Sequence, residues 1–504
     1  MGPMPDWGTL PRMLRDQAGR HPGSTAVVEG GSRLTLSDLR TAAAGVARGL
    51  IALGVEPGDR VALWGPNSAS WVSHAFGVWD AGGVLVPLSA RYKGFEAAEL
   101  IARTGTRVVL VGEKRLADLL PPLHGLTVRR MGTLEPGAVP VRAAEERALA
   151  VGPGDLCEIM STSGTTGTPK GVMLDHAQVL RGYWDWSEIV TLDEHDRYPV
   201  IAPFNHGFGL NAGLIACVLR RATMLPIASF APDALMSLIS SEKVTILAGP
   251  PTLFARILDE LDRAPWDVSS LRVAICGAAS VPAALITRLV ERVGLDRMIN
   301  AYGLMEGTVV SMTRAGDPIE VIANTTGRPV PGIEVKIVDD DGQEVPPGLR
   351  GEILQRGYGV MRGYWDDPAR TAEVIDADGW LRTGDVGVLD ESGNLAIVDR
   401  KKELYIVNGF NVSPAEVESL LLREGSLAQA AVIGVPDPVS GEAGVAYVVP
   451  RPEARTTAGT LLTWAKANMS NYKVPKRIEV VDSLPVNVNG KIDKIALRAR
   501  AAIG

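Results

Sequence analysis

The sequence predicts an α/β protein in two parts. These are a large N-terminal part with two βαβ-type subdomains and a small β-barrel, and a small, mobile α+β domain at the C-terminus. The chain has 504 residues, which is room for about three domain-sized units. Helix and strand patterns alternate as far as residue 300, and short strands separated by turn residues follow. Hydrophobic residues make up 46% and charged residues 22%, so the composition indicates a folded globular chain.

The N-terminal part begins with alternating helices and strands. Apolar spacing predicts a helix over Ser37–Leu53, followed by strands over Arg60–Trp64 and Gly82–Pro87. Residues 196–300 repeat the pattern, with buried strands expected at Val244–Leu247 and Val273–Cys276. Strands that are separated by helices imply parallel βαβ units.

The pattern changes at about residue 326. Short strands are expected at Glu334–Val338, Gly351–Gln355 and Gly393–Val398, separated by Asp-Gly, Pro-Gly and Ser-Gly turns. This predicts a small β-barrel or meander over about 326–398. The N-terminal part is therefore expected to span residues 1–398, and the mobile C-terminal domain residues 399–504.

Composition argues against several classes of function. The net charge of −7 comes from 51 basic and 58 acidic residues, which predicts no attraction for nucleic acid or an anionic membrane. The only cysteines are Cys157, Cys217 and Cys276, too few and too scattered for a disulfide framework or a zinc site. The apolar stretch Gly207–Leu219 is too short to span a bilayer. We expect a cytoplasmic protein with no membrane span.

The most informative segment is Thr162-Ser-Gly-Thr-Thr-Gly-Thr-Pro-Lys-Gly171. Its glycines allow backbone N–H groups to approach an oxyanion, and its hydroxyls donate hydrogen bonds to phosphate oxygens. Lys170 adds a positive charge, and Pro169 excludes a Walker A loop. Taken alone, the segment fits either a phosphate loop or an ordinary polar surface loop.

Further motifs follow this loop in a characteristic order: Tyr302-Gly-Leu-Met-Glu306, Leu381-Arg-Thr-Gly-Asp385, Asp399-Arg-Lys-Lys-Glu403, Gly409-Phe-Asn-Val-Ser-Pro-Ala-Glu-Val-Glu418 and Pro485-Val-Asn-Val-Asn-Gly-Lys491. The set resembles the adenylate-forming superfamily of acyl- and aryl-CoA synthetases, carrier-protein adenylation domains and beetle luciferase. The resemblance runs from about residue 35 to 498 and implies an AMP-forming acid–thiol ligase. Such an enzyme first makes an acyl-adenylate and pyrophosphate from a carboxylic acid and ATP, and a thiol then displaces AMP.

The resemblance implies a nucleotide site. Glu306 matches the family's Mg²⁺ carboxylate, Tyr302 the residue that stacks on adenine, and Asp385 the residue that binds the ribose hydroxyls. Met305 stands where the family usually has threonine. The implied ATP- and AMP-binding residues are Thr162, Ser163, Gly164, Thr165, Thr166, Gly167, Lys170, Gly277, Ala278, Ala279, Tyr302, Gly303, Met305, Asp385 and Arg400.

The resemblance also assigns roles in the C-terminal domain. Lys491 matches the adenylation lysine, which bridges the acid and the α-phosphate, and Lys402 matches the hinge about which the domain rotates. Gly409, Phe410 and Asn411 are expected to line the tunnel for CoA. His206 matches the histidine beside the acyl carboxylate and completes the catalytic set with Lys491 and Glu306.

The acyl pocket is expected to be apolar, aromatic and rich in glycine, which suits a bulky, alicyclic or polycyclic acid. Pro203–Gly209 resembles the same stretch of synthetases that activate steroid-ring fragments. The expected lining residues are Trp184, Trp186, Asn205, His206, Gly207, Asn211, Gly277, Gly303 and Leu304.

Several alternatives remain open at the level of sequence. CoA is the favoured acceptor, because the Gly409–Glu418 segment resembles that of CoA ligases. A carrier protein or a partner enzyme that takes the acyl group is the alternative, as is an enzyme that stops at acyl-AMP. An amino-acid substrate would need a carboxylate such as Asp185 for its ammonium group. A homodimer is compatible with the sequence.

Overall fold

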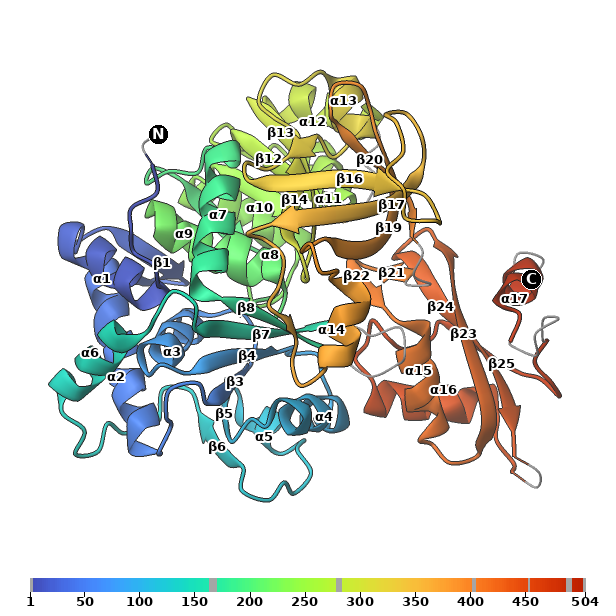
Figure 1. Cartoon of the computed structure of the whole chain (residues 1–504), viewed down its shortest axis with the longest axis horizontal. Coiled ribbons are helices and arrows are strands. Elements are labelled where there is room, and N and C mark those ends of the chain that lie inside the picture. The colour runs from blue at the N-terminus through green and yellow to red at the C-terminus, as the bar shows by residue number, and fades with distance from the viewer. Residues whose placement is uncertain are drawn as a thin grey trace.

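A seven-stranded sheet carries the start of the predicted phosphate loop (Figure 1). The computed structural model describes residues 3–162, 170–277, 283–400, 405–451, 454–485 and 492–501. The sheet has the strand order β18 (Gly363–Tyr364), β8 (Lys170–Asp175), β7 (Leu156–Thr162), β4 (Val84–Leu88), β3 (Arg60–Trp64), β5 (Val108–Val111) and β6 (Thr127–Arg130). Strands β7, β4, β3, β5 and β6 are parallel, as the βαβ prediction requires.

Helices cover both faces of this sheet. The helices α1 (Leu10–Arg20), α2 (Leu36–Ala52), α3 (Ala69–Asp80) and α6 (Val141–Ala150) contribute to the core on one face. The helices α4 (Gly94–Thr104) and α5 (Lys114–Ala117) pack against Trp64 and its neighbours on the other. Burial of both faces explains why β3 and β4 are almost continuously apolar.

The second subdomain has two sheets. The first has the order β2 (Ser32–Thr35), β1 (Thr25–Glu29), β10 (Thr223–Pro226) and β9 (Arg197–Val200). The second has the order β11 (Ile246–Gly249), β12 (Val273–Gly277), β13 (Arg297–Leu304), β14 (Thr308–Met312) and β15 (Arg328–Pro329). It is covered by α10 (Pro232–Glu242), α11 (Pro251–Arg263), α12 (Ala283–Val293) and α13 (Ile319–Asn324).

A third unit follows in the chain. Strands β16 (Ile333–Val338), β17 (Gly351–Gly357), β19 (Leu381–Leu389) and β20 (Leu395–Arg400) form an antiparallel sheet in this order. It is an open meander with β16 and β20 at its edges, one of the two arrangements that the turns predict. Turn residues specify which strands pair through a hairpin, but they do not determine whether the sheet closes.

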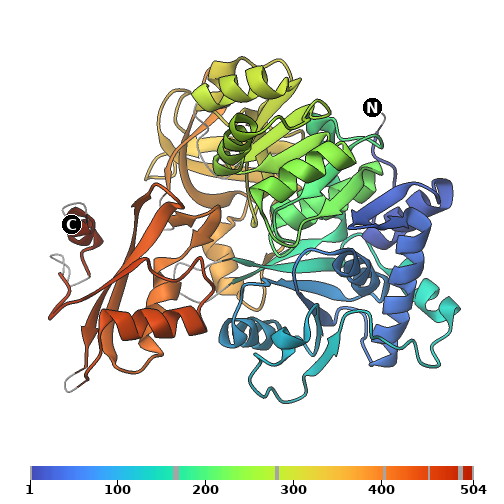
Figure 2. The ribbon, with the colours of Figure 1, turned by 180° about the vertical axis from the view of Figure 1, so that it is seen from behind.

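The C-terminal domain is a five-stranded sheet with three helices. Its strands run β22 (Phe410–Val412), β21 (Tyr405–Val407), β24 (Gly441–Pro450) and β23 (Leu427–Asp437), with β25 (Arg477–Val480) paired to β24. Helices α15 (Pro414–Leu422) and α16 (Ala458–Asn468) form its main core with β23 and β24. Helix α17 (Lys494–Ala501) lies at the edge furthest from the N-terminal part in both views (Figures 1 and 2).

Among the described residues, no helix is both long and apolar enough to cross a membrane. All three cysteines are free and buried, in agreement with the absence of a disulfide framework expected from their spacing.

Two glycines in neighbouring helices offer a matched test of this packing. A Cβ at Gly77 in α3 would lie 2.3 Å from Cγ1 of Val46 in α2, whereas a Cβ at Gly45 would meet no atom within 4 Å. We expect Gly77→Ala to destabilise the fold by roughly 1–3 kcal/mol through overpacking. Gly45→Ala is expected to stabilise it by roughly 0.5–1 kcal/mol, because alanine is the better helix former. Urea unfolding followed by tryptophan fluorescence checks both, and equal effects would contradict the packing described.

Candidate active site

Three of the predicted nucleotide residues meet where β13 approaches the meander. Tyr302 lies on β13, and its hydroxyl donates a hydrogen bond to Oδ2 of Asp385 on β19, at 2.6 Å. Arg400 is the register partner of Asp385 on the neighbouring strand β20. Residues about 80 positions apart are thus brought together as the resemblance implied.

A second group links the phosphate loop to the candidate Mg²⁺ carboxylate. Thr162 and Lys170 are register partners at the ends of β7 and β8, so the segment between them connects an antiparallel pair. Nζ of Lys170 lies 4.5 Å from the ring centroid of Tyr364 on β18. The Tyr364 hydroxyl donates to Oε1 of the buried Glu306, at 2.9 Å. Burial, and then the charge of Glu306, raise the pKa of Tyr364, so its hydroxyl keeps its proton.

The residues present fit a bound Mg²⁺ ion. Mg²⁺ at phosphate sites takes one or two carboxylates and fills its other positions with phosphate oxygens and water. Within the described ranges, no three His, Cys, Asp or Glu side chains converge as a complete protein metal cage. Glu306, joined to Lys170 through Tyr364, supplies one carboxylate, which suits an ion shared with a nucleotide. When bound there, Mg²⁺ would neutralise charge on the phosphate oxygens.

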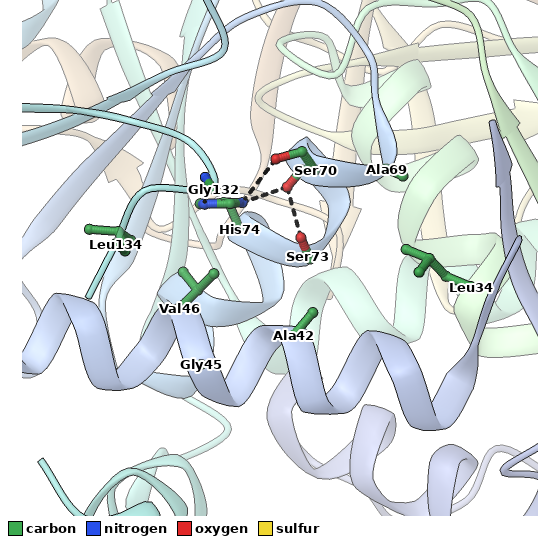
Figure 3. Close-up of a pocket in the computed structure, with 10 residues that line it drawn as sticks. All are labelled: Leu34, Ala42, Gly45, Val46, Ala69, Ser70, Ser73, His74, Gly132 and Leu134. Carbon is green, nitrogen blue, oxygen red and sulfur yellow. Dashed lines mark hydrogen bonds between the residues drawn. The ribbon is translucent and has the colours of Figure 1, made fainter. Parts of the chain in front are cut away.

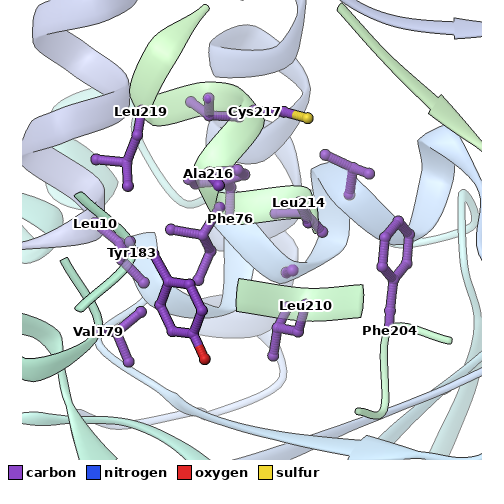
Figure 4. Close-up of a cluster of buried hydrophobic side chains, with 14 of the residues drawn as sticks. Leu10, Phe76, Val179, Tyr183, Phe204, Leu210, Leu214, Ala216, Cys217 and Leu219 are labelled. Atoms are coloured by element: carbon purple, nitrogen blue, oxygen red, sulfur yellow. The ribbon is translucent and has the colours of Figure 1, made fainter. Parts of the chain in front are cut away.

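A third cluster forms on the predicted acyl side. The chain enters it through α8 (Gly207–Gly209) and the π-helix η1 (Leu210–Ile215), which continues into α9 (Ala216–Arg220). A Cβ at Gly207 would lie 3.1 Å from Sδ of Met305, 3.8 Å from the Tyr183 hydroxyl and 3.9 Å from Nδ2 of Asn211. Tyr183 comes from α7 (His176–Val190) and lies among buried apolar side chains that include Leu210 (Figure 4).

Other residues that are predicted to line the acyl pocket have the following positions. Asn205 is half-buried, and the exposed His206 accepts the N–H of Phe208 on its Nδ1, at 3.2 Å. A Cβ at Gly303 would lie only 2.4 Å from the carbonyl oxygen of Thr308, so only glycine fits there. Leu304 ends β13, and Gly277 ends β12 with its Cα beside Ala301 in register.

The two predicted tryptophans differ: Trp186 shares a buried core with Tyr183 and Leu210, whereas Trp184 makes its contacts elsewhere. Trp186 is buried in the core of the N-terminal part. Trp184 packs edge-on against Trp7 at 5.9 Å and under the guanidinium of Arg220 at 3.5 Å. It lines a separate cavity of about 270 Å³ with these residues. The structure therefore places Trp184 with residues outside the Tyr183–Asn211 cluster.

Asp185 is already engaged by other side chains. Arg181 donates to its Oδ2 at 2.8 Å, and the Tyr358 hydroxyl donates to the same oxygen at 2.8 Å. A carboxylate held by a guanidinium is a poor receptor for a substrate ammonium group. This geometry argues against the amino-acid substrate that the sequence left open.

Several predicted residues lie outside the described ranges. They are Ser163, Gly164, Thr165, Thr166, Gly167, Ala278, Ala279, Lys402 and Lys491. Their roles stay predictions from the resemblance.

The predicted CoA residues sit where the C-terminal domain meets the N-terminal part. Asn408 and Gly409 have φ values of 50° and 83° and form the two-residue turn between β21 and β22. A Cβ at Gly409 would be 3.7 Å from Pro250, at the start of α11. Phe410 stacks on Tyr472 with centroids 4.7 Å apart, and the Arg91 guanidinium lies 4.2 Å from the Phe410 ring. Asn411 is the next residue of β22.

A buried charge cluster lies at the same interface and was not predicted from the sequence. Nζ of Lys473 donates to Glu96 of α4 at 2.9 Å and to Glu416 of α15 at 2.6 Å. The Ser470 hydroxyl also lies within 3.0 Å of Glu96. Burial alone would lower the pKa of Lys473, but Glu416 and Glu96 outweigh it and hold that pKa well above its usual value. We call Lys473, Glu96 and Glu416 the interdomain triad.

The cavity between α2 and α3 is not part of this site. It has a volume of about 390 Å³ and is lined by Ala42, Ser70, Ser73 and His74, among others (Figure 3). His74 Nδ1 lies 2.6 Å from the Ser70 carbonyl, and its Nε2 accepts the Gly132 N–H at 3.1 Å. Burial lowers the pKa of His74, so the ring is neutral and both nitrogens are satisfied.

Comparisons with known proteins agree with this geometry. The AMP-binding enzyme family matches residues 14–365, and the C-terminal domain of AMP-binding enzymes matches residues 416–491. A 3-[(3aS,4S,7aS)-7a-methyl-1,5-dioxo-octahydro-1H-inden-4-yl]propanoyl:CoA ligase from Rhodococcus jostii is 42% identical, covering 97% of this chain and 98% of the relative. A feruloyl-CoA synthase from Amycolatopsis is 37% identical, covering 95% and 96%.

A solved structure is similar over the same length. A double mutant of the o-succinylbenzoate CoA synthetase from Bacillus subtilis, bound with its product analogue OSB-NCoA, has a TM-score of 0.83 at 27% identity. The match covers 97% of this chain and 98% of that one.

The interdomain triad can be tested against a second ion pair at the same interface. Glu99 pairs with Arg423 at 2.9 Å, but these side chains are 28% and 45% exposed. We expect Glu96→Gln to weaken docking of the C-terminal domain by about 1–3 kcal/mol, because Lys473 stays buried with one charged partner fewer. Glu99→Gln is expected to change docking by about 1 kcal/mol or less.

Single-molecule fluorescence transfer measures this docking. Val141 and Val480 are 61% and 43% exposed and can be replaced by cysteine for labelling, because the native cysteines are buried. A larger separated population in Glu96→Gln than in Glu99→Gln is expected. An equal change in both variants would show that the triad does not hold the domains together.

Proposed function

This chain belongs to the AMP-binding enzyme family and is an ATP-dependent acid–CoA ligase, and we propose that its acid carries a bulky alicyclic ring system. The observation that carries the proposal is the 42% identity to the octahydroindenyl-propanoyl:CoA ligase over 97% of the chain. The absence of a side chain at Gly207, beside Met305 and Tyr183, supports it, because ring acids need width near the carboxylate.

The first half-reaction brings an anionic acid up to a polyanion, so positioning and charge neutralisation dominate its catalysis. We assign Tyr302 and Asp385 to adenosine, Lys170 to the phosphates and Glu306 to Mg²⁺. Tyr364 positions Glu306 by a neutral hydrogen bond that leaves the carboxylate its charge. Lys491 and His206 complete the catalytic set in this proposal.

The second half-reaction needs a path for the thiol. We assign it to the Asn408–Gly409 turn and Phe410, which lie at the interface beside Pro250 and Arg91. Rotation about Lys402, between residues 1–398 and 399–504, would exchange this segment for Lys491. The three buried, reduced thiols support a cytoplasmic location.

An acid screen tests the proposed function. The enzyme is incubated with ATP, Mg²⁺ and a panel of linear, aromatic and alicyclic acids, with and without CoA, and AMP and acyl-CoA are quantified by mass spectrometry. We expect the highest kcat/KM for acyl-CoA formation with bicyclic propanoic acids. Pyrophosphate release without a thioester, even with CoA present, would instead support an adenylate-only enzyme or one that passes the acyl group to a carrier protein.

Two lysine variants test whether Lys491 acts in the first half-reaction only. We expect Lys491→Ala to slow acyl-AMP formation by roughly a hundredfold or more, because a charge that stabilises the transition state is lost. The same variant should still convert supplied acyl-AMP to acyl-CoA. Lys494→Ala is the control, since Lys494 is bound to Glu418 at 3.0 Å and has no assigned role. Equal loss of both half-reactions in Lys491→Ala would contradict the assignment.

A further inference from the structure

A buried glutamate stands in the acyl cluster without a role in either half-reaction. Glu158 lies on β7 and is 0% exposed. Its Oε1 accepts a hydrogen bond from Nδ2 of Asn211 at 2.8 Å. Its Oε2 and the Oδ1 of Asn211 are buried and have no hydrogen-bond partner among the residues described. Two adjacent polar atoms are thus left unsatisfied inside the protein, which is destabilising unless a ligand completes them.

The pair lies in the cluster that is expected to hold the acid. Asn211 adjoins Gly207, where the main chain comes close to the Tyr183 hydroxyl and Met305. Glu158 precedes Thr162, the first residue of the phosphate loop, by four positions on one strand. At about 3.3 Å per residue, it lies roughly 13 Å from the start of that loop. A bicyclic acid with its carboxylate at the phosphates would direct its ring towards Glu158.

The protonation state of Glu158 suits a hydrogen-bond donor. Burial raises its pKa to about 7, and the bond from Asn211 only partly opposes this. Its register partners Leu85 on β4 and Leu174 on β8 carry no charge. The titratable groups beside it are Tyr183 on α7 and Cys157 on β7, and burial raises the pKa of both, so they are neutral. A protonated carboxyl donates one hydrogen bond through its O–H.

We propose that Glu158, oriented by Asn211, is a specificity-determining residue that donates a hydrogen bond to a ketone oxygen on the ring of the acid. The inference rests on the proposed function, because it needs a ring acid in the pocket. The 42% identical relative is named for an acid with two ring ketones, which provides an acceptor of this kind. Oε2 of Glu158, which has no partner among the described residues, would then donate its hydrogen bond to the substrate.

The test compares two acids that differ in one group. They are a bicyclic octahydroindenyl propanoic acid with a ring ketone and the same acid with that ketone reduced to methylene. With wild-type enzyme at pH 6, we expect the ketone acid to be favoured in kcat/KM by about tenfold to a hundredfold. Because the result is a ratio measured on one enzyme preparation, partial unfolding does not change it.

Variants of Glu158 test whether this residue recognises the ring ketone or only supports the fold. Glu158→Gln keeps a donor of the same shape and is expected to retain the ketone preference, whereas Glu158→Met is expected to reduce the ratio to near one. Asp80→Asn is the control, since Asp80 is another buried carboxyl, with a pKa raised by burial to about 6, but it is bound to Arg15 outside the pocket. It should keep the wild-type ratio.

The pH dependence gives an independent readout. A donating carboxyl must be protonated, so the wild-type ketone preference is expected to be full below pH 7 and to fall as the pH rises through the pKa of Glu158. The ratio for Glu158→Gln is expected to stay constant over the same range, because an amide does not titrate.

Three outcomes would overturn the inference. A wild-type ratio near one, with both acids ligated, leaves the proposed function intact and shows that Glu158 only ties β7 to η1. An unchanged ratio in Glu158→Met leads to the same conclusion. Failure to ligate any ring acid overturns the proposed function, and the inference falls with it.

Discussion

The ammonium group of Lys473, buried between Glu96 and Glu416, is the contact on which the arrangement of the two parts depends. Removing three charges from water is unfavourable by several kcal/mol per ion, so such a cluster forms only when all its members meet with good geometry. Glu96 comes from the N-terminal part and the other two from the C-terminal domain, so the cluster is complete only when the domain is docked. When the domains separate, water can solvate each group again. A polar interface of this kind can therefore be specific and still release, whereas a large apolar interface would resist rotation.

The carboxylates around the site differ in whether a charged or a neutral group binds them. Glu306 is held by the hydroxyl of Tyr364, a neutral donor that fixes the carboxylate while leaving its charge for a cation. Asp185 is held by the guanidinium of Arg181, which cancels its charge and leaves it structural. Glu158 has only a neutral amide on one oxygen and nothing on the other among the described residues. These three acidic residues thus have three different kinds of partner, and the uses proposed for them follow from the chemistry of those partners.

Local pattern predicted the elements well and the tertiary contacts poorly. Strand β3 has the bounds expected from its apolar run, because both of its faces are buried. Strand β11 begins two residues later than expected, although the backbone of Thr245 already hydrogen-bonds to Arg197 and Val273. The motifs pointed to Tyr302 and Asp385, which the structure joins. Tyr364 and the interdomain triad had no sequence signal, since their contacts join residues 58 and 377 positions apart. Trp184 and Trp186 are predicted to line the pocket as part of one aromatic stretch, but helical residues two positions apart project about 200° apart and need not face one pocket.

The residues proposed to recognise the acid and those proposed to line the thiol path lie in different parts of the chain. Glu158, Asn211, Tyr183 and Met305 all belong to the N-terminal part, while Gly409 and Phe410 reach it from the C-terminal domain. Under the proposed assignment, recognition of the acid's ring uses contacts within the N-terminal part, and choice of the thiol uses contacts that docking creates. A change in the triad alters how often the interface forms, but it moves none of the atoms that surround the ring of the acid. If the proposed assignment holds, recognition of the ring and thiol transfer use different sets of contacts, so one chain can keep a docking surface while its acid pocket diverges.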